Sequence, residues 1–174
     1  METQKSAEIH ISRLGLQDVG RVQSFMTDVI SRLPSPDLFA MGDEAYLLEH
    51  MEELGEIYGA FMKGALVAYT VLAFPGLDER NLAREFGVPE EELSRVAVLE
   101  ATVVHETARG HGLQRRFHDL RERRARERGC LYLYSTVHPD NLPSIRNLEA
   151  AGLSLRFTRP MYGGKMRHCY AKRL

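Results

Sequence analysis

One apolar run constrains the fold of this chain more than any other segment: residues 96–104, which read VAVLEATVV. Apart from Glu100 and Thr102, every residue in this run is apolar. A continuous apolar run of this length predicts a strand that is covered on both faces, as in the centre of a sheet. The stretch ETARGHGLQRRF follows almost directly, and its two glycines lead into a basic helix. The run therefore predicts a central sheet with helices packed on it.

Helical and strand periodicities alternate along the rest of the chain. The predicted elements are a strand at 8–14, a helix at 18–33 capped by Asp18, a helix at 43–53, two strands within 56–74 that turn at Lys63-Gly64, short helices within 76–95, the strand at 96–104, a helix at 112–128, a strand at 130–137, a helix that Asp140 or Asn141 caps and Gly152 ends, and strands at 154–158 and 167–172. This order predicts the α+β class (α/β three-layer), with a mixed central β-sheet of about seven strands flanked by helices.

Composition excludes several classes of protein. The 174 residues carry 23 basic and 24 acidic side chains, so the net charge of −1 is not that of a nucleic-acid polycation. No apolar run is long enough to span a membrane, and no secretory leader is evident. Neither the two cysteines, Cys130 and Cys169, nor the seven histidines have metal-ligand spacing. We therefore expect a single domain over residues 1–174 in a reducing cytoplasm, with no metal and no nucleic-acid or membrane partner.

The glycine turn between strand and helix predicts an anion site. The first N–H groups of a helix lack intrahelical partners, and the helix dipole places partial positive charge beside them. Gly110 and Gly112 allow phosphate oxygens to approach the backbone, while Arg109, Arg115 and Arg116 add positive charge. The alternative is a plain strand-to-helix turn that needs two flexible residues. The spacing is neither that of a Walker loop nor that of a dinucleotide fingerprint.

The helix after the turn is rich in arginine, with seven arginines between Arg115 and Arg128. A nucleic-acid-binding face is one interpretation of this pattern. However, Asp119, Glu122 and Glu127 lie among the arginines and can pair with them at i,i+4 spacing, which favours a solvated helix.

The glycine turn resembles the acyl-CoA-binding motif of the GNAT superfamily of N-acetyltransferases. The signature of that family is Arg or Gln, two residues, Gly, one residue, and then Gly or Ala. Arg109 and Gly112 match the first two fixed positions, whereas Gln114 departs at the third. The later stretch VHPDNLPSIRNLEAAGL is similar to the Asn-anchored segment of the family, with Asn141 and Ser144 in place. The resemblance extends to the order of elements over essentially the whole chain.

The resemblance implies the GNAT acyl-CoA N-acyltransferase fold, in which a bulge splays the fourth strand from the fifth. It also implies acetyl-CoA as the co-substrate, with its pyrophosphate on the glycine turn and its pantetheine arm beside the strand that ends at Val104. The residues assigned to acetyl-CoA are then Thr102, Val103, Val104, Arg109, Gly110, His111, Gly112, Leu113, Gln114, Asn141 and Ser144. Because dimers through the C-terminal strands are common in the family, a homodimer is a further expectation.

Acetyl transfer to an amine needs a base, because an alkyl ammonium with a pKa of about 10.4 is protonated at neutral pH. Glu100 is the candidate, since burial in its strand would raise its pKa and the resemblance gives this position to an acidic base. The alternatives are an acid on a solvent-wet face and an acid that pairs with an arginine. The backbone N–H of Val103 is the candidate for stabilising the developing oxyanion.

The general acid cannot be assigned in the same way. The resemblance points to a tyrosine seven residues after the anchoring asparagine, where this chain has Leu148. Tyr134, Tyr162 and Tyr170 are the alternatives, as is a reaction without such an acid.

These features together predict an enzyme, an N-acetyltransferase that moves the acetyl group of acetyl-CoA to a primary amine by direct attack in a ternary complex. The segments 33–51 and 75–95 would flank the acceptor. The acids of the second segment favour a cationic amine, although a solvated acidic loop fits equally well. Leu148 and Gln114 motivate one alternative, a non-catalytic acyl-CoA-binding module. Another is a regulator that binds a different phosphoanion with the same glycine turn.

Overall fold

The computed structural model describes residues 8–34, 44–161 and 163–174. Its strands are β1 (Ile9–Arg13), β2 (Gly55–Met62), β3 (Ala65–Ala73), β4 (Val96–Val104), β5 (Tyr132–Val137), β6 (Ser154–Met161) and β7 (Lys165–Arg173). Its helices are α1 (Val19–Ser31), α2 (Glu44–Glu52), α3 (Leu113–Glu127) and α4 (Leu142–Ala150), with short 3-10 helices η1 (Leu16–Asp18), η3 (Leu82–Phe86), η4 (Glu90–Arg95) and η5 (Glu106–Ala108) between them. The order of strands and helices is the predicted one.

The seven strands form one mixed sheet in the order β1-β2-β3-β4-β5-β7-β6. β4 and β5 run parallel, and the other neighbouring pairs in this sheet are antiparallel. β7 lies between β5 and β6, so the last strand of the chain is not at the edge of the sheet. The predicted mixed sheet of about seven strands is therefore confirmed.

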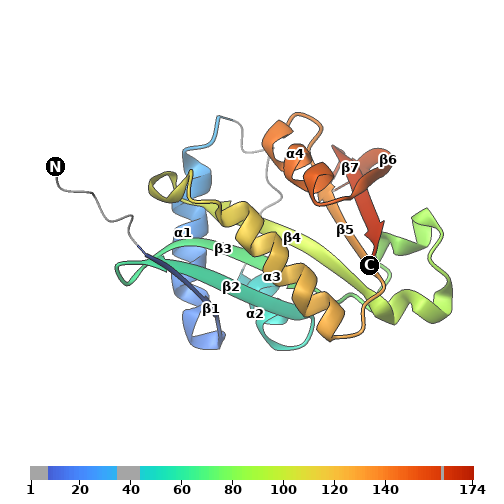
Figure 1. Ribbon diagram of the computed structural model, residues 1–174, viewed down its shortest axis with the longest axis horizontal. Helices are drawn as coiled ribbons and strands as arrows, with labels where there is room; N and C mark the ends of the chain where they lie inside the picture. Colours follow the sequence, from blue (N-terminus) through green and yellow to red (C-terminus); the bar gives the residue numbers. More distant parts are fainter. Residues whose placement is uncertain (1–7, 35–43, 162) are drawn as a thin grey trace.

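Helices cover both faces of the sheet, with α3 in front of β2, β3 and β4 and α1 behind them in the view of Figure 1. On the α1 face, Met26 of α1 and Leu47 of α2 belong to one buried cluster with Tyr69 of β3. On the opposite face, Phe117 of α3 is fully buried in a cluster with Ala68 of β3. The helices α1, α2 and α3 thus bury apolar side chains against the sheet, which forms the middle layer.

The middle of the sheet is irregular at two neighbouring points on β4. Between the pairs Thr70↔Thr102 and Leu72↔Leu99, β3 contributes one residue and β4 contributes two, which is a β-bulge at Glu100 and Ala101. β4 pairs with β5 only through its first three residues, from Val96 to Val98. Beyond that point the two strands separate, as the resemblance implies.

Several local predictions need correction. Asp18 does not cap α1 through its side chain; instead its carboxylate accepts a hydrogen bond from Gly15 N–H (3.0 Å) in the preceding turn. The first helix ends at Ser31, two residues earlier than predicted. β6 continues to Met161, beyond the predicted 154–158. The helix α3 is not solvated all round, because Arg121 is only 6% exposed. The predicted start of the second helix at Asp43 lies outside the described residues.

Within the described ranges, no helix is both long enough and apolar enough to cross a membrane. In the same ranges, no cluster of three or more His, Cys, Asp or Glu side chains is arranged to hold a metal ion. Cys130 and Cys169 are buried thiols that form no disulfide.

Candidate active site

The glycine turn joins η5 to α3, and two of its residues adopt the left-handed backbone conformation. Gly110 has φ 79° and Gly112 has φ 70°. A side chain would be strained at either φ value, and the space where its Cβ would lie is open, with no atom within 4 Å. The first intrahelical bond of α3 runs from Arg116 N–H to Gly112 O (3.0 Å). The preceding amides of Leu113 and Gln114 therefore lack helical acceptors, which makes them candidate donors to an anion.

A hollow of about 370 Å³ lies over the turn, between β4, α1 and the first turns of α3 and α4. Its lining includes Thr102, Val103, Val104, Arg109, Gly110, Gly112, Leu113, Gln114, Asn141 and Ser144. The structure therefore brings together all the residues that were assigned to acetyl-CoA except one. That exception is His111, whose Nδ1 donates to Ala108 O (3.1 Å).

Asn141 occupies the N-cap of α4, as its sequence position predicts. Its side-chain Oδ1 accepts a hydrogen bond from Ser144 N–H (3.4 Å). Because both residues also line the hollow, the cap shapes the wall that the start of α4 contributes to it.

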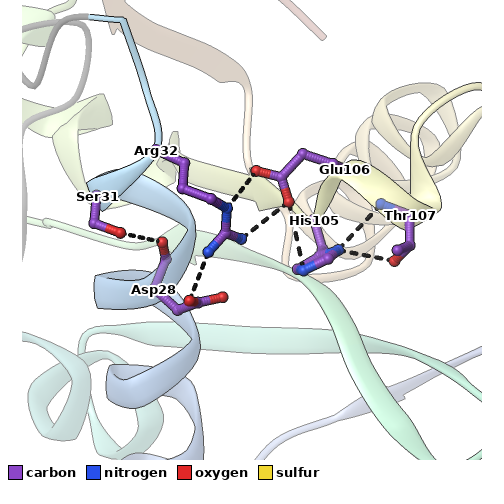
Figure 2. A network of polar contacts seen from close by, with 6 residues as sticks. All are labelled: Asp28, Ser31, Arg32, His105, Glu106 and Thr107. Carbon is purple, nitrogen blue, oxygen red and sulfur yellow. Dashed lines mark hydrogen bonds and ion pairs between the residues drawn. The ribbon is translucent and has the colours of Figure 1, made fainter.

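A polar network ties the C-terminal end of α1 to the segment just before the glycine turn (Figure 2). The Arg32 guanidinium donates to both carboxylate oxygens of Glu106 (2.9 and 2.9 Å) and to Asp28 (2.6 Å). These hydrogen bonds lower the pKa of Glu106 to about 2. His105 accepts from Thr107 N–H (3.1 Å) and lies 3.4 Å from Glu106. The network holds α1 against the other side of the hollow.

A second and larger cavity, of about 610 Å³, opens where β4 and β5 separate. It shares five lining residues with the hollow over the glycine turn: Thr102, Gln114, Asn141, Ser144 and Asn147. The two spaces therefore adjoin along the end of β4. A ligand with its phosphates on the glycine turn can reach the larger cavity without leaving the protein surface.

Glu100 lies in the β4 bulge and lines this larger cavity. Burial raises the pKa of its carboxyl group, while His50 and a hydrogen bond from Tyr46 lower it in part. Of the interpretations open from sequence, a partly buried acid on a cavity wall fits this position better than an acid on a solvent-wet face. The structure gives it no ion pair with an arginine side chain within the described residues.

Two residues on α2 face the same cavity; they lie in the segment 33–51 that was expected to flank the acceptor, but neither was singled out from the sequence as a site residue. His50 is buried, and its Nδ1 donates to Tyr46 O one turn earlier (2.7 Å). The ring centroids of Tyr46 and His50 are 4.1 Å apart. Their i,i+4 spacing on a short helix was visible in the sequence, but nothing local indicated that this face of α2 meets β4.

The candidates for the general acid differ in whether they line the larger cavity. Leu148 lines the cavity, so the position that the family gives to tyrosine is apolar here. Tyr134 also lines the cavity, and its hydroxyl oxygen accepts from Leu82 N–H (3.0 Å). Tyr170 donates to Glu149 (3.2 Å) and is not part of the lining. Tyr162 lies outside the described residues.

The acids of the loop after β3 mostly face away from the cavity. Only Asp78 among them belongs to its lining within the described residues, and Arg80 donates to both of its oxygens (3.0 and 3.0 Å). Glu85 instead accepts from Arg159 (2.7 Å). These pairs favour the reading of a solvated acidic loop over a loop that selects a cation.

The chain matches one family model, described as the acetyltransferase (GNAT) family, over residues 23–153, which is more than half of its length. A comparison with curated proteins gives no match.

Solved structures match over nearly the whole chain. The ribosomal-protein-alanine N-acetyltransferase from Brucella melitensis is 18% identical, with 95% of this chain and 99% of that chain covered and a TM-score of 0.70. The ribosomal-protein-S18-alanine N-acetyltransferase from Escherichia coli is 16% identical, with 95% and 94% covered and a TM-score of 0.68. The structure of yncA from Salmonella typhimurium with its cofactor acetyl-CoA is 14% identical, with 95% and 94% covered and a TM-score of 0.68. At these identities the likeness shows the fold, and it confirms the predicted fold class.

Proposed function

Since the chain belongs to the acetyltransferase (GNAT) family and is an acyltransferase, we propose that it moves the acetyl group of acetyl-CoA to a primary amine by direct attack within a ternary complex. One observation carries the proposal: the hollow over the glycine turn opens into the cavity that holds Glu100. A phosphate-binding end and a proton-accepting group are thereby connected through the separation of β4 and β5.

The residues of the hollow fit acetyl-CoA. The backbone amides of Leu113 and Gln114 and the open space at Gly110 and Gly112 suit a pyrophosphate, since nothing there crowds the backbone. Arg109 adds a cation at the same edge. The end of β4, from Thr102 to Val104, is the wall along which the pantetheine arm would lie. We also propose that His111 contacts acetyl-CoA, from the glycine turn, although it does not line the hollow.

Glu100 would act as the base. When bound, acetyl-CoA supplies an activated acetyl group, so the residues of the chain need to deprotonate the amine and orient it. A carboxylate with a raised pKa is suited to accept a proton near neutral pH, because its pKa lies closer to the working pH. Sequence made the backbone N–H of Val103 the candidate for stabilising the developing negative charge on the carbonyl oxygen. Val103 lies opposite Tyr69 of β3, two residues from the bond that His105 N–H donates to Val67 O (2.8 Å), so its N–H points at β3 and we do not assign this role to it.

The proposal also covers the domain organisation, the cellular location, the oligomeric state and the general acid. Residues 1–174 would form one N-acetyltransferase domain that works in the cytoplasm and dimerises through β6 and β7. Tyr134 is the tyrosine that we assign as general acid, because it lines the cavity that Glu100 also lines.

A non-catalytic acyl-CoA-binding module is the second candidate function, and Leu148 favours it. This residue lines the cavity but has no proton to donate to a departing thiolate. Such a module would bind acetyl-CoA and release no CoA with any amine. The direct reaction remains the better-supported function, because a thiol with a pKa of about 8.5 can leave as the thiolate without an acid.

Thermal-shift titration with acetyl-CoA, CoA, ATP and NAD tests the binding site first. A ligand that binds only the native state raises the melting temperature, so we expect acetyl-CoA and CoA to raise it and ATP and NAD to leave it unchanged. A free-thiol assay with a panel of primary amines then tests transfer. The absence of a shift with both CoA forms would contradict the binding site. CoA binding without thiol release from any amine would favour the non-catalytic module.

The variant Gly112→Arg tests whether the glycine turn carries the binding. An arginine at φ 70° is strained and fills the open space, so the shift caused by acetyl-CoA should disappear. Gly87→Arg is the matched control, because Gly87 also has a left-handed φ of 91° and open space but lies in the loop after β3. It should carry the same backbone strain and still bind acetyl-CoA. Equal loss of binding in both variants would point to unfolding instead.

A further inference from the structure

Arg121 of α3 is a buried cation to which the reaction proposed above gives no role. It is 6% exposed and lines the larger cavity. Burial lowers its pKa to about 10, so it still carries its charge at neutral pH. Its Nε has no hydrogen-bond partner in the part of the chain that the structure describes. Burying a guanidinium with an unsatisfied donor costs free energy, and the hydrogen bonds that Arg121 does make must offset that cost.

The bonds that Arg121 does make are to the backbone of the β4 bulge. Its Nη1 donates to Val71 O (3.2 Å) and to Glu100 O (3.3 Å). Val71 is the single residue of β3 that lies opposite the two bulged residues of β4. The ladder between the strands is interrupted at this point, and the guanidinium supplies a donor to a carbonyl on each side of the interruption.

A second side chain completes the arrangement. The hydroxyl of Thr70 donates to Ala101 O (3.4 Å), the carbonyl of the other bulged residue, and shares a hydrogen bond with the Thr102 hydroxyl (2.7 Å). The carbonyls of Val71, Glu100 and Ala101 thus all have side-chain donors. The bulge is therefore held by specific hydrogen bonds from both α3 and β3.

We infer that Arg121 is a positioning residue for acetyl transfer, which holds the β4 bulge open so that the Glu100 carboxylate stays in the cavity. The inference rests on the proposed role of Glu100 as the base. The side chains of a strand alternate between its two faces. If β4 paired with β3 without the bulge, the side chains beyond this point would therefore turn to the opposite face. A register without the bulge would therefore place Glu100 and Thr102 differently relative to the two adjoining spaces.

The charge of Arg121 has a second effect on Glu100. Several titratable or charged groups line the cavity around the Glu100 carboxylate: Tyr46, His50, Asp78, Arg80, His118, Arg121, Tyr134, His138, Arg159 and Arg167. Burial raises the pKa of Glu100, and His50, the hydrogen bond from Tyr46, Arg121 and Arg80 lower it in part, in that order. Removing the charge of Arg121 should therefore raise that pKa further and move the acidic limb of the rate profile to higher pH.

The test compares Arg121→Met and Arg121→Lys with Arg124→Met, measuring kcat, the KM for acetyl-CoA and the pH profile of kcat/KM. Arg124 lies one turn further along α3, and its guanidinium pairs with Glu56 instead of the bulge. We expect Arg121→Met to lower kcat by about 10–10²-fold, the scale of a misplaced reacting group, with little change in the KM for acetyl-CoA. The acidic limb should move to higher pH. Arg121→Lys, which keeps a charged donor, should restore part of kcat.

Arg124→Met should destabilise the protein but leave kcat and the pH profile as in the wild type. The inference is overturned if Arg121→Met keeps its kcat and its acidic limb, or if Arg124→Met changes both in the same way. Should Arg121→Met fail to fold, Thr70→Val tests the same bulge: a smaller loss of kcat supports the inference, and an unchanged kcat overturns it. A Glu100→Gln variant with wild-type kcat would instead overturn the proposed function, and the inference with it.

Discussion

Two glutamates of the sheet, the buried Glu56 and the half-buried Glu100, lie near two arginines of one helix, and their situations are opposite. Glu56 of β2 receives two hydrogen bonds from Arg124 (2.8 and 2.9 Å) and one from the Tyr58 hydroxyl (2.7 Å). Glu100 of β4 has Arg121 nearby, but that guanidinium donates to its backbone carbonyl. The pKa of Glu56 falls to about 2, led by the hydrogen bonds from Arg124, whereas burial raises the pKa of Glu100.

The two glutamates differ because a nearby arginine lowers the pKa of a carboxylate strongly only where it donates to the carboxylate oxygens. A carboxylate whose oxygens are filled by a guanidinium stays ionised and contributes to stability. A carboxylate whose neighbouring arginine bonds to the backbone keeps its oxygens accessible from the cavity and its pKa closer to neutral. We therefore regard Glu56 as a structural residue and Glu100 as the base.

The sharpest way to break the comparison is Glu100→Gln, which should give the largest effect. An amide cannot accept the proton of the amine, so kcat should fall by about 10²–10⁴-fold, the usual contribution of a general base. The melting temperature and the shift caused by acetyl-CoA should stay close to those of the wild type. Unchanged turnover and an unchanged pH profile would remove Glu100 as the base.

The reciprocal variant is Glu56→Gln, and its effect should fall on stability. The change removes the charge-assisted hydrogen bonds that Glu56 accepts from Arg124 and leaves that guanidinium with Glu127 alone, which should lower the free energy of unfolding by about 2 kcal/mol. Urea denaturation measures this change, and kcat per folded molecule should not differ from the wild type at a temperature where the variant is folded. A large loss of kcat in the folded variant would mean that the two glutamates are not functionally separate.

Acid titration of stability should distinguish the same two residues. The pKa of Glu56 is about 2 in the folded protein against an ordinary 4.5, so its contribution is present above pH 4.5 and is lost as the pH falls towards 2. After allowance for solvent screening this is on the order of 2 kcal/mol. Glu100 has the opposite sign, because its raised pKa makes the folded protein less stable as the pH rises above 4.5. Glu56→Gln should flatten the acid loss, and Glu100→Gln should not; the reverse outcome would contradict both assignments.

The smallest effect should come from the exposed network at the end of α1. Arg32→Gln removes the hydrogen bonds to Glu106 that tie α1 to the glycine turn. Exposed ion pairs contribute little, so the affinity for acetyl-CoA should weaken by no more than about threefold. Isothermal titration would measure this, with Arg123→Gln on the exposed side of α3 as the control. A loss of more than tenfold, about 1.4 kcal/mol, would mean that the network forms part of the binding site.

Local patterns predicted the elements of the molecule but not their mutual contacts. The strand at 96–104 agrees with β4 residue for residue, and Asn141, one of the two predicted capping residues, caps α4. Both signals are local, since an apolar run and a capping residue act within a few positions. The insertion of β7 between β5 and β6 depends on pairing between distant strands, for which the single sequence carried no signal.

The residues of the candidate site also divide into those that local sequence identified and those that depend on contacts between distant segments. Most residues that the family resemblance assigned over the glycine turn fall in three short stretches of sequence, 102–104, 109–114 and 141–144. Tyr46 and His50 lie in the segment that was expected to flank the acceptor, but neither they nor Arg121 were singled out as site residues, because they reach the cavity from two separate helices. Arg121 in particular lies within a run of charged residues, where a solvated helix is the expected environment.

The most direct test of the account is a carbon-13 NMR titration of the glutamate side-chain carboxyl groups, assigned with Glu56→Gln and Glu100→Gln. The account predicts that the Glu100 resonance titrates above the ordinary 4.5, while the Glu56 resonance remains that of an ionised carboxylate well below it. Both resonances titrating near 4.5, or Glu100 titrating below Glu56, would contradict the division into a structural carboxylate and a base.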